Sequence, residues 1–381
     1  MDNINKKRIV FITGTRADYG KMKSLMQILE NSENFEVYVF VCGMHLSKTF
    51  GCTYGEVIND GYANIHVAYG LKQSFDTSIN LGNTISYFSG YIDNIEPDMI
   101  IVHGDRIDAL AGAVVGVLHN IMVGHIEGGE LSGTVDESIR HAISKFAHIH
   151  FVCTKEAQER LIQLGEEPER IYVIGSPDID IMMSKTLPSL QSAKERYDIK
   201  FDRYGILMYH PVTTEYSSIS ERIRRVVDAI IASNKNYIVI YPNNDLGYEI
   251  ILHEYERFKN IKRFRVFPSI RFEFFLTILK HAEFMIGNSS AGIREAGIYG
   301  IPAIDIGSRQ SGRYYENTSR NIVHVNENKN DITKAIENIE IYACETHLFG
   351  DGNSTLRFYE IIAKPEFWNT EIQKHFVDFR M

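Results

Sequence analysis

The sequence predicts an α/β protein built from two doubly wound, Rossmann-like domains with parallel sheets. Three observations support this prediction. Short runs rich in Val, Ile and Phe alternate along the whole chain with amphipathic stretches of helical period. The apolar runs are nearly continuous, which is typical of strands buried on both faces of a parallel sheet. The chain has 381 residues, a length that suits two domains.

The two halves of the chain follow the same plan of strands and helices. In the first half we expect strands at 8–13, 35–42, 99–103, 121–126, 149–153 and 171–174, with helices at 21–30, 136–147 and 155–164. In the second half we expect strands at 205–209, 237–241, 264–267, 284–286, 303–306 and 322–325, with helices at 217–233, 270–280 and 291–299. The likeness between the halves is architectural, because no internal sequence repeat is visible.

The domain boundary is expected near residues 176–200, after the turn Gly175-Ser176-Pro177. We therefore predict an N-terminal domain over 1–180 and a C-terminal domain over 181–360. The stretch 351–376 has a helical pattern, and the last part, 361–381, is expected to be a helix that can pack back on the first domain. Two doubly wound domains of similar size imply a cleft between them.

Composition and charge exclude several classes of protein. The formal net charge of -9 argues against a broad surface for nucleic acid or anionic membranes, although a cleft can still bind a small anion. No apolar stretch approaches the roughly 18 residues that span a bilayer. The four cysteines show no C-x-x-C spacing, and the N-terminus lacks the apolar segment of a secretory leader. We therefore expect a cytoplasmic protein.

Charged residues follow the expected strands of the first half, where parallel sheets bind ligands. Arg16 lies in a Thr-Gly-Thr-Arg turn that is neither G-x-G-x-x-G nor a P-loop; it suits a phosphate, but an ordinary surface arginine explains it better. Asp105 and Glu127 each end a buried run, and Asp136 begins a helix. Helix capping is an alternative role for Asp105 and Asp136. Together, the three acids offer carboxylates for general acid/base catalysis.

The second half carries residues that bind anions. His210 directly follows a strand, and the string Gly-Asn-Ser-Ser-Ala-Gly-Ile-Arg-Glu-Ala-Gly at 287–297 follows another. Ser289 and Ser290 at the start of a helix suit a diphosphate, although a serine N-cap explains one of them. Glu295 could accept a hydrogen bond from a ribose diol. Two more arginines follow the next strand, in the segment 307–313.

Read as a set, these segments resemble one enzyme family, the hydrolysing UDP-N-acetylglucosamine 2-epimerases of sialic acid biosynthesis. The resemblance runs from Arg8 to about Phe358. The non-hydrolysing branch of this fold typically has AGLR after the strand-end Glu, where this chain has Gly128-Gly129-Glu130. The segments that carry the resemblance, in order, are TGTRADYGK, VHGDRIDALA, HIEGGELSGTVDESIRHAISKFAH, HPVTT, IGNSSAGIREAG and GSRQSGR.

The resemblance implies a GT-B-like arrangement with the active site between the two domains. Asp105, Glu127 and Asp136 would surround the sugar and move protons, and His210 would sit beside the diphosphate. It further implies a homo-oligomer, a dimer or tetramer, that requires neither metal nor cofactor and serves capsule or surface polysaccharide synthesis. The residues that would hold UDP are Arg16, Arg106, Asn243, Ser289, Ser290, Glu295 and Arg313.

The implied reaction converts UDP-N-acetylglucosamine and water to UDP and N-acetylmannosamine through 2-acetamidoglucal. Three alternatives remain open. The first is a hydrolysing epimerase that acts on UDP-2,4-diacetamido-2,4,6-trideoxyhexose in legionaminic acid synthesis. The second is a GT-B glycosyltransferase, which would need an acceptor. The third is a two-domain sugar-binding protein, which would not release UDP over many turnovers.

Overall fold

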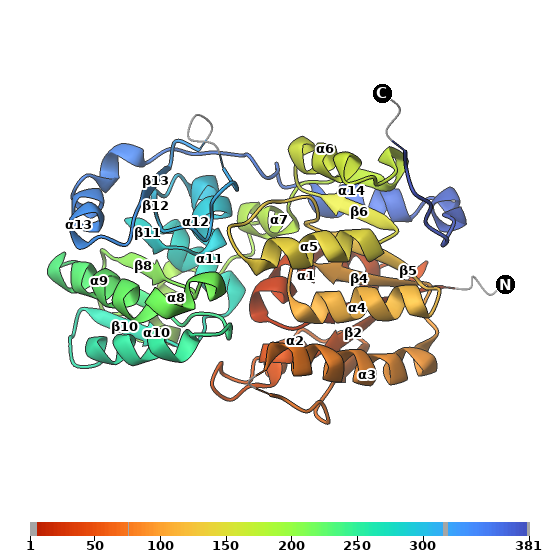
Figure 1. Ribbon diagram of the computed structural model, residues 1–381, viewed down its shortest axis with the longest axis horizontal. Helices are drawn as coiled ribbons and strands as arrows, with labels where there is room; N and C mark the ends of the chain where they lie inside the picture. The colour runs from red at the N-terminus through yellow and green to blue at the C-terminus, as the bar shows by residue number, and fades with distance from the viewer. Residues whose placement is uncertain (1–5, 75, 315–318, 379–381) are drawn as a thin grey trace. The chain divides into compact units, whose positions relative to one another are not determined.

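The chain forms two compact units, each with its own parallel sheet. In the computed structural model, residues 6–74, 76–314 and 319–378 are described. The first unit contains residues 1–130, 136–183 and 349–381, and the second contains residues 131–135 and 184–348. Figure 1 shows the strands and helices of both units.

The sheet of the first unit has seven strands in the order β3-β2-β1-β4-β5-β6-β7, and every pairing is parallel. Within β1, Ile9 and Phe11 enter one hydrophobic cluster, whereas Val10 and Ile12 enter another. This alternation places one core on each face of the sheet. The strands are β1 (Lys7–Thr13), β2 (Phe35–Val41), β3 (Asn64–Val67), β4 (Met99–His103), β5 (Met122–Ile126), β6 (Ile149–Val152) and β7 (Ile171–Val173).

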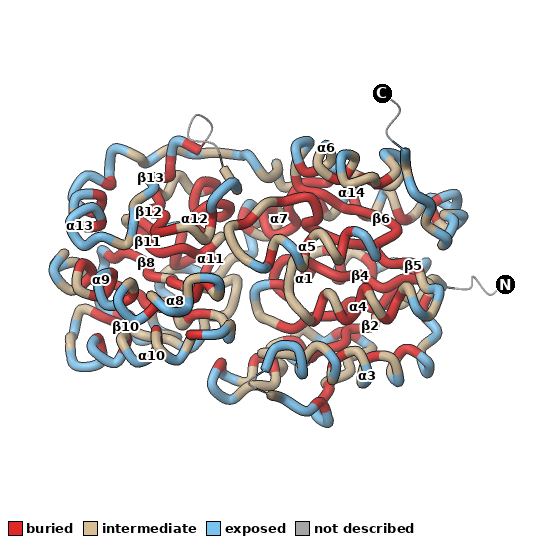
Figure 2. The backbone as a smooth tube through the Cα atoms, viewed as in Figure 1, coloured by how far each residue is buried: buried red, intermediate tan, exposed pale blue. Residues whose placement is uncertain are grey.

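Helices cover both faces of this sheet, so the buried backbone lies in the middle of the unit (Figures 1 and 2). One core contains side chains of α1 and α14, and the other contains side chains of α3 and α4. The helices are α1 (Arg16–Glu30), α2 (Tyr54–Asn59), α3 (Thr77–Ile95), α4 (Ile107–Leu118), α5 (Val135–Phe146), α6 (Lys155–Gln163), α7 (Pro177–Met183) and α14 (Ser354–Ile362).

The second unit repeats the plan with a six-stranded parallel sheet of order β10-β9-β8-β11-β12-β13. Its strands are β8 (Gly205–Met208), β9 (Tyr237–Ile240), β10 (Phe264–Phe267), β11 (Phe284–Gly287), β12 (Ala303–Ile306) and β13 (Ile322–Val325). Its helices are α8 (Leu190–Tyr197), α9 (Ile219–Ala232), α10 (Tyr248–Tyr255), α11 (Phe272–Lys280), α12 (Ser290–Arg294) and α13 (Lys329–Glu337). Both units therefore have the predicted Rossmann-type strand order.

The structure differs locally from the sequence prediction at two places. The strand Asn64–Val67 at the sheet edge was not predicted, because its four residues are only half-buried and show no apolar run. The helix expected at 291–299 ends at Arg294 and continues as a 3₁₀ turn, Ala296–Tyr299. A Cβ atom on Gly297 would lie 2.2 Å from Thr346 Oγ1, so the segment that contains Thr346 packs closely against this turn.

The last part of the chain returns to the first unit at Phe349, earlier than the expected residue 361. Within 351–376, helical structure is limited to α14 and the 3₁₀ turn Pro365–Asn369. Phe358, Ile362 and Phe367 are buried in a core of the first unit. No helix in the described part of the chain is long and apolar enough to cross a membrane. Residues 1–5, part of the N-terminus expected to lack a leader, lie outside that part.

We predict that Phe358→Ala destabilises the first unit by about 3–5 kcal/mol, because it removes a fully buried aromatic ring that contacts Phe151. Leu356→Ala, on the same helix but 51% exposed, should change the stability by less than about 0.5 kcal/mol. The measurement is urea unfolding followed by fluorescence of Trp368, the single tryptophan, which packs against the same core. Equal midpoints for the two variants would contradict the prediction.

Candidate active site

Two acids lie at the carboxyl ends of neighbouring strands in the first unit. Asp105 follows β4 by two residues, and Glu127 directly follows β5. The backbone of Glu127 has a φ of +67°, a left-handed conformation that costs a non-glycine residue about 1–3 kcal/mol. Its N–H donates to Phe151 O at 3.1 Å, which fixes this turn against β6. The strained turn therefore holds the carboxylate in one position.

Buried basic side chains surround Glu127, whose side chain is only 5% exposed. Lys21 Nζ and His103 Nε2 lie 3.2 and 3.1 Å from its Oε2 atom, and Arg140 Nη2 lies 3.9 Å from Oε1. The same Arg140 forms an ion pair with Asp105 and is 1% exposed. A buried charge is stable only when it is paired, so the buried carboxylates need the positive charges of Lys21 and Arg140.

A third acid extends this ion-pair network. Asp178, near the start of α7, is 1% exposed and lies 3.9 Å from Lys21 Nζ. Lys21 belongs to α1, which follows β1, and β1 is the neighbour of β4 in the sheet. The network therefore joins α1, the ends of two strands, α5 and α7.

Asp136 and Arg140 both lie on α5, four residues apart and therefore on one face of that helix. Both are buried, and Asp136 lies in the first turn, as predicted. The N-cap of α4 is Arg106, which makes no side-chain cap, so the capping role considered for Asp105 is wrong.

The structure places Arg16 at the first position of α1, in an ion pair with Glu56 of α2. Its Nε atom donates to Glu56 Oε2 at 2.8 Å, and its side chain is 16% exposed. Arg16 is therefore not an ordinary surface arginine. The preceding turn is fixed by a capping box between Thr15 and Asp18.

In the second unit, hydrogen bonds join three residues at the ends of β8, β9 and β11: the predicted His210 and Asn243, and Asn288. The His210 N–H donates to Asn288 Oδ1 at 2.6 Å, and the Asn243 N–H donates to His210 Nδ1 at 3.0 Å. Asn288 Nδ2 also donates to the His210 carbonyl at 2.9 Å. Because Nδ1 of His210 accepts a hydrogen bond, Nε2 carries the hydrogen of the neutral ring.

The predicted anion-binding string begins α12. Ser289 is the N-cap and accepts from the Ala291 N–H at 3.3 Å, so the capping role is confirmed for this serine. Ser290 is the first helical residue, and Glu295 is the buried C-cap of this five-residue helix. A helix this short has a small dipole, so side chains must supply most of any affinity for a diphosphate.

The segment after β12 contacts the β11 end through its own donors. Arg309 Nη1 and Gln310 Nε2 donate to the Asn288 carbonyl at 3.2 and 2.7 Å. Arg313 Nε donates to the Leu131 carbonyl at 2.7 Å. The structure thus places His210, Asn243 and the start of α12 together at the carboxyl ends of the strands of the second sheet.

Sequence reasoning missed Lys21, Arg140, Asp178 and Asp108. All four lie on helices, and only contacts around Glu127 and Lys21 distinguish the first three from ordinary helical charges. Asp108 is fully buried, and Cys42 Sγ donates to its Oδ1 at 3.5 Å. Burial and the nearby charge of Asp18 raise the pKa of Asp108 to about 6. A Cβ atom at Gly14 would lie 2.1 Å from Asp108 Oδ2, which explains the glycine in that turn.

Across residues 6–74, 76–314 and 319–378, no group of three or more His, Cys, Asp or Glu side chains is arranged to hold a metal ion. Acids with cations on one Rossmann sheet, and a histidine with a small-residue helix start on another, are features of an enzyme that handles nucleotide sugars.

The model of the UDP-N-acetylglucosamine 2-epimerase family matches residues 27–363, and this chain belongs to that family. A relative from Neisseria meningitidis named UDP-N-acetylglucosamine 2-epimerase is 49% identical, over 98% of this chain and all of its own length. The UDP-N,N'-diacetylbacillosamine 2-epimerase (hydrolyzing) of Legionella pneumophila is 32% identical, over 93% of this chain and 95% of its own.

Solved structures share the fold. A UDP-N-acetylglucosamine 2-epimerase from Neisseria meningitidis, bound to UDP-N-acetylglucosamine, matches with a TM-score of 0.79 and 17% identity, over 93% of this chain and 99% of its own. The enzyme of Methanocaldococcus jannaschii in complex with UDP-N-acetylglucosamine and UDP matches with a TM-score of 0.78 and 21% identity, over 93% and 99%. The GT-B-like, two-domain fold class predicted from the sequence is confirmed.

We predict that Asp108 makes the first unit less stable as the pH rises. Its pKa in the folded state, about 6, lies above the ordinary value of 3.8, so its contribution is fully present below pH 4 and is lost as the pH rises through 6. The difference corresponds to about 3 kcal/mol. Asp108→Asn should therefore flatten the fall in unfolding free energy between pH 4.5 and 7.5.

Urea unfolding at several pH values, followed by Trp368 fluorescence, measures this effect. Glu33→Gln, which changes an exposed acid of the same unit, is the control and should keep the wild-type pH dependence. The same pH dependence in Asp108→Asn as in the wild type would exclude Asp108 as its source.

Proposed function

We propose that this protein is a hydrolysing UDP-N-acetylglucosamine 2-epimerase that converts its substrate and water to UDP and N-acetylmannosamine. The observation that carries the proposal is the buried carboxylate of Glu127, held at a strand end by Lys21, His103 and Arg140. Epimerisation at C2 needs acids in fixed positions around a sugar. A fixed, charge-compensated carboxylate beside a second acid, Asp105, meets that requirement.

The proposed first step is an elimination. The C2 proton of the sugar is not acidic, so the C1–O bond to the diphosphate breaks first or at the same time, and UDP leaves with the bonding electrons. Positive charge at C1 and the ring oxygen then acidifies C2. A carboxylate takes the C2 proton, and the C1=C2 double bond of 2-acetamidoglucal forms. Carboxylates beside a cationic sugar stabilise it, as in glycosidases.

The second step is a hydration. Water adds its oxygen to C1, and a proton returns to C2 from the face opposite to the one that lost it. Addition to the opposite face gives N-acetylmannosamine. Because the two faces need separate proton donors and acceptors, one acid is insufficient. Asp105 and Glu127 are the proposed main pair, and Asp136 is proposed to act in the hydration.

The leaving diphosphate needs electrostatic stabilisation, which the second unit can supply. The proposed donors are His210 through Nε2, together with Ser289, Ser290 and Arg313; Asn243 and Glu295 are proposed to hold the nucleoside. From the first unit, Arg16 and Arg106 are proposed to contact the nucleotide as well. Each well-placed donor to a developing charge commonly contributes about 3–4 kcal/mol. No metal or other cofactor takes part in this proposal.

Names of relatives support the hydrolysing reaction and the pathway. Two relatives carry "hydrolyzing" in their names: the Legionella protein and a GDP/UDP-N,N'-diacetylbacillosamine 2-epimerase of Campylobacter jejuni. Another, 32% identical over 87% of this chain, is the polysialic acid biosynthesis protein P7 of Escherichia coli. We therefore propose a cytoplasmic homo-oligomer in sialic acid synthesis. A diacetamido UDP-sugar is the second candidate substrate.

The test is turnover of UDP-N-acetylglucosamine in D₂O without any acceptor, followed by ¹H NMR. We expect equal amounts of UDP and free N-acetylmannosamine, with deuterium at C2. A product that remains attached to UDP, or a requirement for an acceptor sugar, would contradict the proposal. Side-by-side turnover of the diacetamido UDP-sugar decides the substrate, since the preferred one should show the higher kcat/KM.

We predict that Asp105→Asn and Glu127→Gln lower turnover at least about 100-fold, the scale of general acid/base catalysis, while UDP still binds. Asp136→Asn should release 2-acetamidoglucal, because it slows the hydration. Asp60→Asn is a matched control, since Asp60 forms a partly buried ion pair with Lys23 outside the Glu127 network. It should retain turnover within about 3-fold.

Turnover by NMR and UDP affinity by calorimetry separate these outcomes. Full activity in both the Asp105 and Glu127 variants would exclude them as the catalytic pair. Product without solvent deuterium at C2 would exclude the elimination itself.

A further inference from the structure

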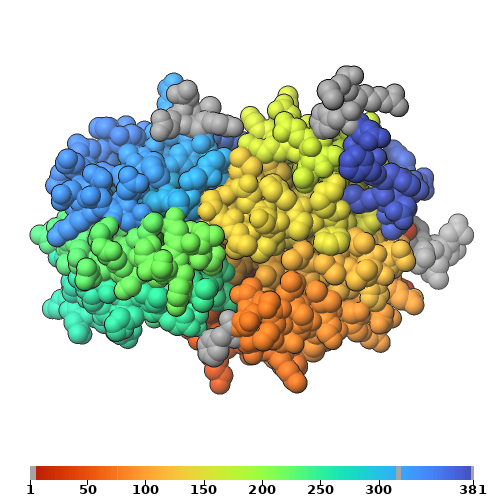
Figure 3. Space-filling model, viewed as in Figure 1, coloured from red at the N-terminus to blue at the C-terminus, as the bar shows by residue number. Residues whose placement is uncertain are grey.

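The C-terminal segment after α14 packs on the first unit, and between Asn369 and residue 378, the last that the structure describes, it forms no helix. The Glu371 carbonyl accepts from Arg170 Nη1 at 3.0 Å. In the space-filling view this dark blue segment lies against the yellow-green surface of α6 and its neighbours (Figure 3). Its most buried polar contact is made by Lys374, whose side chain is 22% exposed.

Lys374 caps the C-terminal end of α5. Its ammonium group donates to the carbonyls of Ser144, Lys145 and Ala147 at 3.4, 3.0 and 2.6 Å. The last carbonyls of a helix have no partner within the helix and carry its negative dipole end, so a cation here satisfies both. The N-terminal half of the same helix carries Asp136 and Arg140.

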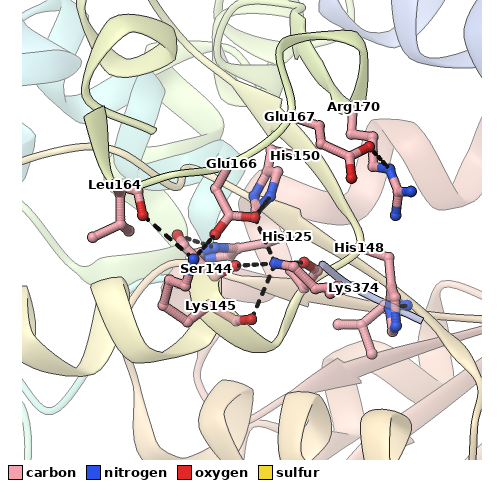
Figure 4. Close-up of polar contacts among 12 residues, drawn as sticks. His125, Ser144, Lys145, His148, His150, Leu164, Glu166, Glu167, Arg170 and Lys374 are labelled. Atoms are coloured by element: carbon pink, nitrogen blue, oxygen red, sulfur yellow. Dashed lines mark hydrogen bonds and ion pairs between the residues drawn. The ribbon is translucent and has the colours of Figure 1, made fainter. Parts of the chain in front are cut away.

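An acid holds the Lys374 ammonium in place. Glu166, whose side chain is 2% exposed, forms an ion pair with Lys374 and accepts from His150 Nε2 at 3.0 Å (Figure 4). Lys145 Nζ reaches the other carboxylate oxygen at 2.7 Å, but its side chain is 48% exposed. Burial, the largest single effect, would raise the pKa of Glu166, but the hydrogen bond from His150 and the nearby charge of Lys374 lower it to about 2. The carboxylate is therefore charged at neutral pH.

A hydrogen-bonded path continues from this helix end to the acid-bearing turns. Ser144, whose carbonyl accepts from Lys374, has its hydroxyl 3.0 Å from His125 Nδ1 (Figure 4). The other ring nitrogen of His125 lies 2.8 Å from the carbonyl of Gly104, the residue before Asp105.

The chemistry of the partners fixes the tautomer of His125. A carbonyl oxygen can only accept, so Nε2 donates to Gly104; in the neutral ring Nδ1 then accepts from the Ser144 hydroxyl. Complete burial is the largest cause that lowers the pKa of His125, to about 3, so the ring is neutral.

The same two side chains support the turn that follows Glu127. A Cβ atom on Gly128 would lie 2.9 Å from both His125 Nδ1 and Ser144 Oγ. The Ser144–His125 pair therefore touches the turn of one proposed acid and hydrogen-bonds the turn of the other. A shift of the pair would move both acids, although it contacts neither carboxylate.

We propose that Ser144 and His125 are positioning residues for the reaction, and that Lys374 of the C-terminal segment fixes them through the end of α5. The path Lys374–Ser144–His125–Gly104 is called the positioning path below. The inference rests on the proposed function, because it assigns the path to the placement of Asp105 and Glu127.

Steady-state kinetics with UDP-N-acetylglucosamine on the full chain test the path. Ser144→Ala and His125→Asn should lower kcat about 10- to 100-fold, the range for residues that orient reacting groups, with KM and UDP affinity unchanged. His125→Gln should recover activity to within about 3-fold of wild type, because its amide nitrogen can replace Nε2 as the donor to Gly104. Misplaced acids should also release more 2-acetamidoglucal per hexosamine.

Lys374→Met tests the link to the C-terminal segment, with Lys145→Met as the matched control. Both remove an ammonium from Glu166, but Lys145 caps no α5 carbonyl. Lys374→Met should lower kcat about 10-fold and raise the glucal fraction, whereas Lys145→Met should stay within about 2-fold of wild type. Equal effects of the two variants would overturn the proposal, because they would show only a loss of charge around Glu166.

The remaining outcomes are also decisive. Wild-type kcat in Ser144→Ala and Lys374→Met, both with normal circular dichroism and melting temperature, would overturn the positioning path. Ser144→Ala decides the test if His125→Asn fails to fold. A wild-type enzyme that releases no free hexosamine would instead sink the proposed function, so the two failures are distinguishable.

Discussion

The carboxylate of Glu127 must be compensated where it is buried, and much of the first unit follows from that requirement. An isolated charge at a strand end in a protein interior is expensive, and removal of one partner of a buried pair commonly costs about 3–5 kcal/mol. The strand order brings the compensating side chains together, because β1, β4 and β5 are adjacent in the sheet. The helix after β1 brings Lys21, β4 ends in His103, and the helix after β5 returns Arg140.

Arg140 makes the two acids interdependent. Its guanidinium is fully buried and contacts both Asp105 and Glu127. A movement of either acid would therefore change the ion pairing of the other. The C-terminal end of the helix that carries Arg140 is held by Lys374 and by Ser144, whose hydroxyl lies 3.0 Å from His125 Nδ1. The surroundings of both carboxylates therefore depend on α5 as well as on their own turns.

The sequence predicted what depends on local pattern and missed what depends on long-range contact. Apolar runs located twelve of the thirteen strands that the structure describes, and acids after two of those runs marked the strand-end site. The sequence did not predict β3, because this half-buried strand at the sheet edge has no apolar run. The pairing of Lys21 with Glu127 spans 106 positions, and no local signal identifies such a partner. The helix expected at 291–299 ends at Arg294, and the 3₁₀ turn that follows contains Gly297, whose close packing against Thr346 is also a tertiary effect.

Because the chain returns to the first unit at Phe349, the first unit can be completed only after the second unit has been synthesised. The second unit is nearly continuous in sequence, from Ser184 to Leu348, whereas the first needs side chains from both ends of the chain. Domains generally fold from the N-terminus during synthesis. Here the N-terminal sheet leaves the ribosome long before Phe358 and Ile362 can cover its core. Part of one face of the nascent sheet, beside the area that α1 covers, therefore stays exposed until the residues after Leu348 have been synthesised.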